Sequence, residues 1–136
     1  AITTKVSTFI QDMLKSGTAI PNFIFNRLDY LLWQKEPKNF RFTFRSSVEH
    51  FYPQTPPEKN ERLPNDILHC LGNLCLISQS HNSRFTNNMP KAKLANFGHI
   101  EHNSLKLEVM MKEADTWGIE SIEKHHDEMV KVLNKQ

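Results

Sequence analysis

The stretch VEHFYPQ, residues 48–54, places an acid and a base side by side shortly before a proline. A histidine can act as a general base because its pKa lies near the working pH. Carboxylate and amide oxygens are suitable ligands for a hard cation such as Mg²⁺. Glu49 and His50 are followed by Asn73 and Asn82. These four residues are candidates for phosphodiester hydrolysis, which requires a base for the attacking water and a metal that stabilises charge on the phosphate.

Each of these residues also has a purely structural reading. Glu49 and His50 are equally a polar strand end, where neighbouring side chains point to opposite faces. The strand must therefore bend for both to face one metal. Asn73 follows a glycine and is typical of a turn, while Asn82 could cap a helix or face solvent. His81, beside Asn82, is a second candidate ligand that we rank lower.

The elements that position these residues follow from hydrophobic periodicity. Residues 41–49 alternate between apolar and polar side chains, which predicts a half-buried strand. A proline-rich loop spans residues 54–64, and residues 74–77 form a short apolar run that predicts a second strand. Helices are expected over about 3–15, 21–34, 65–70 and 80–86, shortly after Pro90, and over 105–114 and 119–133.

The aromatic residues of the second helix are expected to pack in the core: Phe23, Phe25, Tyr30 and Trp33. His125 and His126 resemble a metal pair, but adjacent helical positions lie about 100° apart and do not face one ion. His126 falls on the apolar stripe of the last helix, so we expect a packed histidine there. The spacing of the other histidines singles out none of them: His69, His99 and His102.

Length and composition indicate one soluble globular domain over residues 1–136. Hydrophobic residues make up 38% and charged residues 24%, and the net charge of +2 is compatible with nucleic-acid binding without establishing it. No apolar run approaches the ~20 residues of a membrane span. Ala1 in place of a methionine indicates a fragment of a longer protein.

Cysteine usage limits the kinds of site and the cell compartment. Cys70 and Cys75 form no CxxC pair, so we expect small core residues in a reducing cytoplasm. A four-cysteine structural zinc site is excluded because the ligands are missing.

Three motifs in order resemble one nuclease superfamily. VEHFYPQ, then GNLCLIS, then SHNSRFTNNMPKAK resembles the [DE]H-x-x-P, N-L, N, K pattern of HNH (His-Me finger) nucleases. A close version is the C-terminal nuclease domain of GmrSD-type (type IV) restriction enzymes, whose members typically read EHIxPQ and then GNLxLL. The resemblance covers residues 48–93 closely and the flanking helices, with Trp117, more loosely. Phe51 replaces the usual isoleucine, and zinc-binding cysteines are absent, as is common in this branch.

The resemblance implies an α+β, mainly helical fold with a ββα-metal core at about 41–90. A helical flank (1–40) and C-terminal helices (91–136) would surround it. By position, His50 would be the general base, and Asn73 would brace the loop and orient it. Glu49 and Asn82 would bind a divalent ion, Mg²⁺ or Mn²⁺. The basic residues flanking this site are candidates for sequence-independent phosphate contacts: Lys93, Lys91, Arg84 and Arg45, with Arg41 on the Arg45 strand face.

The function implied is a metal-dependent DNA endonuclease in restriction and phage defence, acting on modified or unmodified DNA. A separate recognition or nucleotide-hydrolysing domain is expected, since no GxxxxGK[ST] loop occurs here. The alternative is a non-catalytic nucleic-acid-binding or interaction module that retains the nuclease fold.

Overall fold

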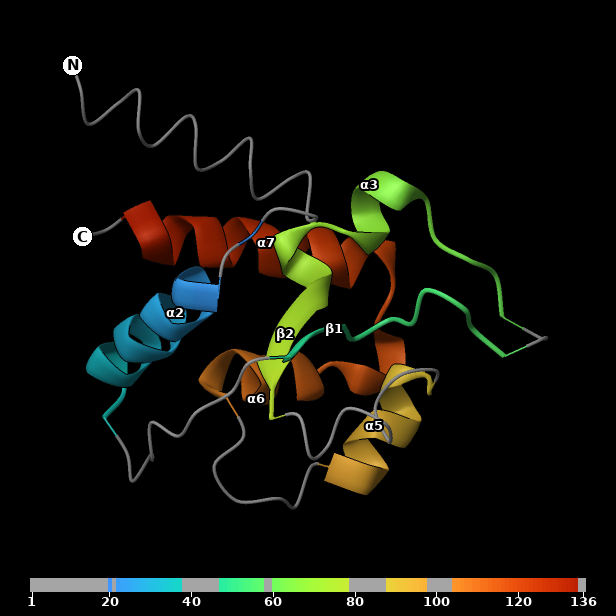
Figure 1. Cartoon of the computed structure of the whole chain (residues 1–136), viewed down its shortest axis with the longest axis horizontal. Helices are drawn as coiled ribbons and strands as arrows, with labels where there is room; N and C mark the ends of the chain where they lie inside the picture. The colour runs from blue at the N-terminus through green and yellow to red at the C-terminus, as the bar shows by residue number, and fades with distance from the viewer. Residues whose placement is uncertain are drawn as a thin grey trace.

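A computed structural model of the chain describes residues 20, 22–37, 47–57, 60–78, 88–97 and 104–134. These parts are mainly helical with one small sheet, which confirms the expected α+β class. The element order is α2 (Asn22–Lys35), β1 (Ser47–His50), α3 (Asn65–Leu68), η1 (Leu71–Asn73), β2 (Leu74–Ile77), α5 (Pro90–Phe97), α6 (Leu105–Met111), η2 (Ala114–Thr116) and α7 (Ile119–Asn134) (Figure 1).

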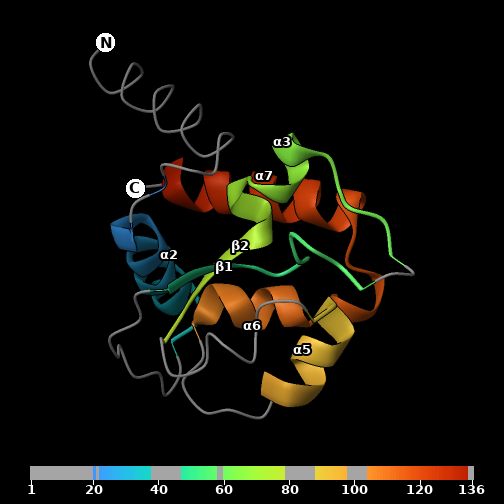
Figure 2. The same cartoon turned by 45° about the vertical axis from the view of Figure 1, so that its right-hand side comes forward.

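The two strands pair antiparallel, and their register places His50 opposite Leu74 and Ser47 opposite Ile77. All four residues of β2 are buried. This burial explains why its sequence LCLI is apolar throughout instead of alternating. Helices α7 and α6 lie on opposite sides of the sheet (Figures 1 and 2). The sheet is therefore held inside a helical shell, with the end of β1 close to the start of β2.

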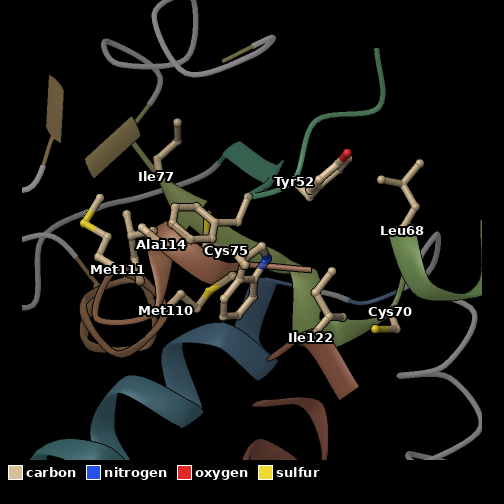
Figure 3. Packing of buried hydrophobic residues seen from close by; sticks show 12 residues of the cluster. Tyr52, Leu68, Cys70, Cys75, Ile77, Met110, Met111, Ala114 and Ile122 are labelled. Atoms are coloured by element: carbon tan, nitrogen blue, oxygen red, sulfur yellow. The ribbon is translucent and has the colours of Figure 1, made fainter. Parts of the chain in front are cut away.

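The buried apolar side chains form two clusters. One lies between the end of β1, α6 and the start of α7 (Figure 3) and contains Phe51, Tyr52, Leu68, Cys70, Cys75, Ile77, Leu107, Met110, Met111, Ala114, Trp117 and Ile122. The other joins α2, η1, β2 and the end of α7 and contains Ile20, Ile24, Phe25, Leu28, Leu71, Leu74, Leu76, Met129 and Leu133. Strand β2 contributes to both clusters, and so links the two halves of the core.

The start of helix α6 is capped from two sides. Ser104 Oγ accepts a hydrogen bond from the Leu107 amide at 3.1 Å. The buried carboxylate of Asp29 accepts from the amides of Leu105 and Lys106 at 2.9 and 3.2 Å. A helix N-terminus leaves backbone amides without partners, and negative charge there is favourable. Asp29 thus fastens α2 to α6, which explains why a carboxylate lies among apolar residues.

Helix α6 also supplies a fully buried lysine to the sheet. The Lys106 ammonium donates to the Leu74 carbonyl and contacts Met110 Sδ at 3.4 Å. A two-stranded sheet leaves outward carbonyls at its edges, and buried carbonyls require donors. Burial lowers the Lys106 pKa to about 8.

The aromatic residues of α2 do not all pack in the core. Phe25 is buried, but Phe23 is 65% exposed and Tyr30 is 42% exposed. The buried face of α2 instead runs through Ile24, Phe25, Leu28 and Asp29. The expectation of core packing was wrong for Phe23 and Tyr30 because their positions fall on the opposite side of the helix.

Helix α7 is correctly predicted in extent, but its buried stripe differs by one position. Its buried residues are Ile122, His125, Met129 and Leu133. His125, not His126, is therefore the packed histidine, and Ile119 is exposed. His126 lies at the edge of the stripe, where its Nδ1 accepts a hydrogen bond from the Gly72 amide at 3.2 Å.

Several predicted elements fall outside the described residues: the helix over 3–15, the first part of the strand over 41–46, and the helix over 80–86. Strand β1 is thus seen only over Ser47–His50. Among the helices that the structure describes, none combines the length and the apolar character that crossing a membrane requires.

Candidate active site

His50 is the last residue of β1, and its half-buried imidazole has hydrogen-bond partners at both nitrogens. His50 Nε2 lies 3.0 Å from Nδ1 of His69. Its Nδ1 lies 3.3 Å from the side-chain amide nitrogen of Gln54, which is exposed. One nitrogen therefore faces the protein, and the other faces a surface side chain that a water molecule can replace.

The surroundings of His50 keep its ring neutral. Burial is the largest cause that lowers the His50 pKa to about 4, and electrostatic interactions with His69, Lys93 and Arg62 lower it further. At neutral pH the imidazole is therefore unprotonated, the state in which it can accept a proton from water.

Asn73 is fully buried, and its side-chain amide forms hydrogen bonds with the turn that follows His50. Its Oδ1 accepts from the Tyr52 amide at 2.8 Å and from Trp117 Nε1 at 3.1 Å. Its Nδ2 donates to the carbonyls of Tyr52 and Leu68, both at 3.0 Å. The Asn73 carbonyl also accepts from the Phe51 amide at 2.8 Å. Through these bonds the backbone immediately after His50 is fixed to η1.

Lys93 approaches the same turn from helix α5. Its side chain is fully buried, and its ammonium donates to the carbonyls of His50 and Phe51 at 2.6 and 2.9 Å. Burial lowers the Lys93 pKa to about 8. The resemblance implied that Lys93 contacts phosphate, whereas here its ammonium is directed at the backbone that carries His50. Lys91, two residues earlier on α5, is exposed.

Glu49 lies next to His50 in sequence, but its side chain is oriented by a different residue. Glu49 Oε1 accepts a hydrogen bond from Ser47 Oγ at 2.7 Å. Residues two apart on a strand share a face, whereas His50 belongs to the other face. The Glu49 carboxylate remains half-buried.

The described residues do not assemble a complete metal site. Within them, no group of three or more His, Cys, Asp or Glu side chains is placed to hold an ion. Asn82, Arg84 and Arg45 lie outside the described residues, as does His81. A partly exposed carboxylate fits Mg²⁺, which keeps several of its waters and binds through one or two carboxylates.

Sequence reasoning missed three residues around His50. His69 and Gln54 contact its ring, and Arg62 is held beside it by the Gln54 carbonyl at 3.2 Å and Asn65 Oδ1 at 2.6 Å. The available signal was the strand pairing. Because His50 faces Leu74, residues shortly before Leu74 must lie near residues shortly after His50. His69 and Gln54 are both in that range.

Comparison with known proteins places the chain in a family. A family model described as "GmrSD restriction endonucleases, C-terminal domain" matches residues 7–132. No curated protein and no solved structure matches the chain. The matched range includes every described residue around His50.

Proposed function

The chain belongs to the family of GmrSD restriction endonuclease C-terminal domains, and from this premise we propose that it is a metal-dependent DNA endonuclease of a restriction system. The observation that supports this proposal best is the His50 imidazole. It is neutral at neutral pH, fixed at the end of β1, and directs one nitrogen at an exposed side chain. An unprotonated ring nitrogen in a fixed position within reach of water is the first property that a general base requires.

In the proposed reaction, His50 Nδ1 accepts a proton from a water molecule that takes the place of the Gln54 amide. The water oxygen forms a bond to phosphorus while the ester P–O bond on the opposite side breaks. The departing oxygen then takes a proton from solvent. Asn73 and Lys93 act only on the position of the base, since both hold the backbone of residues 50–52.

The proposal assigns a divalent ion, Mg²⁺ or Mn²⁺, to Glu49 and Asn82. When bound, the ion neutralises charge that develops on the phosphate. Because Glu49 and His50 lie on opposite faces of β1, this assignment requires the Glu49 carboxylate to leave Ser47 and turn around the strand end toward the phosphate that His50 faces, as in the ββα arrangement of His-Me finger nucleases. That arrangement requires the helix expected over residues 80–86 to complete the site.

Exposed basic residues around the turn are suited to contact the DNA backbone. Arg62 is anchored next to His50, and Lys91 is exposed on α5. We include Arg84 and Arg45 in this role. Phosphate contacts of this kind give salt-sensitive affinity without sequence selectivity. Selectivity for particular or modified DNA would come from a separate recognition domain.

The metal requirement is tested with supercoiled plasmid in Mg²⁺ or Mn²⁺, with and without a chelator. The wild-type chain should nick or linearise the plasmid only with the ion. Glu49→Gln should need a higher ion concentration, because it removes the carboxylate charge, whereas the exposed Glu36→Gln should behave as wild type. Salt-dependent binding without cleavage in any metal would instead favour the non-catalytic binding module.

A further inference from the structure

We propose that His69 is a positioning residue for the base His50. Nδ1 of His69 accepts a hydrogen bond from Nε2–H of His50, and this bond keeps the Nδ1 lone pair of His50 directed at the attacking water. This inference rests on the proposed nuclease function for its catalytic consequence. It names a hydrogen-bond acceptor that neither the motif nor the metal assignment includes.

The contact between the two rings is a directed hydrogen bond and not a stacking contact. The nitrogens are 3.0 Å apart, whereas the ring centroids are 5.1 Å apart with an interplanar angle of 77°. The nitrogens thus lie between the rings, each pointing at the other. A hydrogen bond between two nitrogens at this distance requires that one nitrogen carries the proton and donates it, and that the other is unprotonated and accepts it.

The direction of that bond follows from Gln54. Its amide nitrogen is a donor, so the His50 Nδ1 that it faces at 3.3 Å must be the acceptor and carries no proton. In a neutral imidazole the proton is then on Nε2, which faces His69. His69 Nδ1 accepts a hydrogen bond from that N–H, and the His69 proton lies on Nε2. This proton arrangement gives the three ring nitrogens in these two contacts compatible partners.

The backbone of His69 is held firmly enough to fix the ring of its neighbour. His69 is the C-cap of α3, and its amide donates to the Asn65 carbonyl at 3.0 Å. It lies between Leu68 and Cys70, which are both buried in the core. The Leu68 carbonyl accepts from Asn73 Nδ2. Asn73 therefore fixes the backbone on both sides, next to His50 and next to His69.

The chemical consequence appears when His50 takes the proton of water. The ring becomes a cation whose Nε2–H still donates to His69 Nδ1. His69 thereby holds the ring in one orientation before and after the proton moves. Without this acceptor, the His50 ring can rotate or change tautomer, and its Nδ1 lone pair then no longer points at the attacking water.

The test compares His69→Phe, which keeps an aromatic ring without an acceptor, with His69→Asn, whose amide oxygen can take the place of Nδ1. Ring nitrogens are observed by NMR in protein labelled with ¹⁵N-histidine, and kcat and KM are measured on plasmid. In the wild type we expect His50 to carry its proton on Nε2, with a scalar coupling across the bond to His69 Nδ1. His69→Phe should mix the His50 tautomers and lower kcat by about 10- to 100-fold at nearly unchanged KM. His69→Asn should retain the His50 tautomer and most of kcat.

The proposal would be overturned by a wild-type His50 protonated on Nδ1, by a His69→Phe variant with wild-type kcat, or by a divalent ion that shifts both rings together as joint ligands. A histidine needed only for folding would lower the unfolding temperature without changing the His50 ring signals, and that too would count against it. If the coupling is present but the wild-type chain cleaves no DNA, the nuclease assignment fails and the hydrogen bond stands.

Discussion

At the scale of single residues, the turn after His50 is fixed by groups whose roles depend on burial. Asn73 uses both its oxygen and its nitrogen inside the protein, and Lys93 directs a buried ammonium at two backbone carbonyls. A buried polar group is costly unless it is fully hydrogen-bonded. Here the hydrogen bonds of Asn73 and Lys93 offset the cost of burying their polar groups, and they do so at the turn that positions the proposed base.

Asn73→Ala should therefore lower the free energy of unfolding by about 3 kcal/mol or more. The change leaves the Tyr52 amide and Trp117 Nε1 without their acceptor, and the carbonyls of Tyr52 and Leu68 without a donor. Urea unfolding followed by Trp fluorescence measures it, with the exposed Asn26→Ala as control. Equal losses for the two variants would show that the Asn73 network contributes little to stability.

The motif made His50 and Asn73 predictable as site candidates, but not the environment of Lys93. A lysine in a polar run is normally solvated, and nothing local shows that its ammonium meets two carbonyls 42 and 43 residues away. His69 is similar, because its partner is 19 residues away and is brought near only by the strand pairing. The sequence indicated which residues were candidates for the site, but it did not indicate which groups Lys93 and His69 contact.

At the scale of elements, the position of η1 against α7 decides where β2 begins. Gly72 lies so close to α7 that a Cβ there would overlap the Ile122 carbonyl oxygen and lie 2.7 Å from His126 Cβ. The backbone of α7 cannot move away from such a Cβ as easily as a flexible side chain could. The GN pair of the motif thus combines a close approach to α7 with the Asn73 bonds to the turn after His50.

Gly72→Ala should destabilise the protein by about 1–3 kcal/mol or more, because η1 must move away from α7. Gly118→Ala is the matched control, since no atom lies within 4 Å of the Cβ position there. Thermal unfolding of both variants by circular dichroism tests this difference. Similar melting temperatures for the two would mean that η1 can shift at little cost.

Element types and approximate ends were predictable from periodicity, as β2, α6 and α7 show. The orientation of two helices was less predictable. Phe23 and Tyr30 of α2 are exposed, and the α7 stripe passes through His125 instead of His126. In both helices the sequence places apolar residues on more than one face. Contacts with η1, β2 and α6 determine which of these faces is buried.

At the scale of the whole molecule, β2 lies between two apolar clusters and takes a buried lysine from α6. The Lys106 pKa is lowered to about 8, mainly by burial. Between that value and its ordinary value of 10.5, the unfolded chain binds more protons than the folded one. The contribution of Lys106 to stability therefore rises with pH across this window.

Lys106→Met tests this linkage. The stability of the wild type relative to this variant should increase by up to about 3 kcal/mol between pH 7.5 and pH 10. Urea unfolding at several pH values measures the difference, and Lys131→Met provides a control at an exposed lysine of α7. A constant difference between wild type and Lys106→Met over this range would contradict the expected deprotonation.

The most direct test of the central claim is the cleavage rate of His50→Ala on supercoiled plasmid with Mg²⁺ or Mn²⁺. A general base contributes about 10²- to 10⁴-fold to a rate, so the variant should be slower than wild type by at least about 100-fold. Its DNA affinity and its unfolding temperature should stay close to those of the wild type, because the His50 backbone bonds to Lys93 do not need the ring. Cleavage by His50→Ala at the wild-type rate would contradict the assignment of His50 as the base.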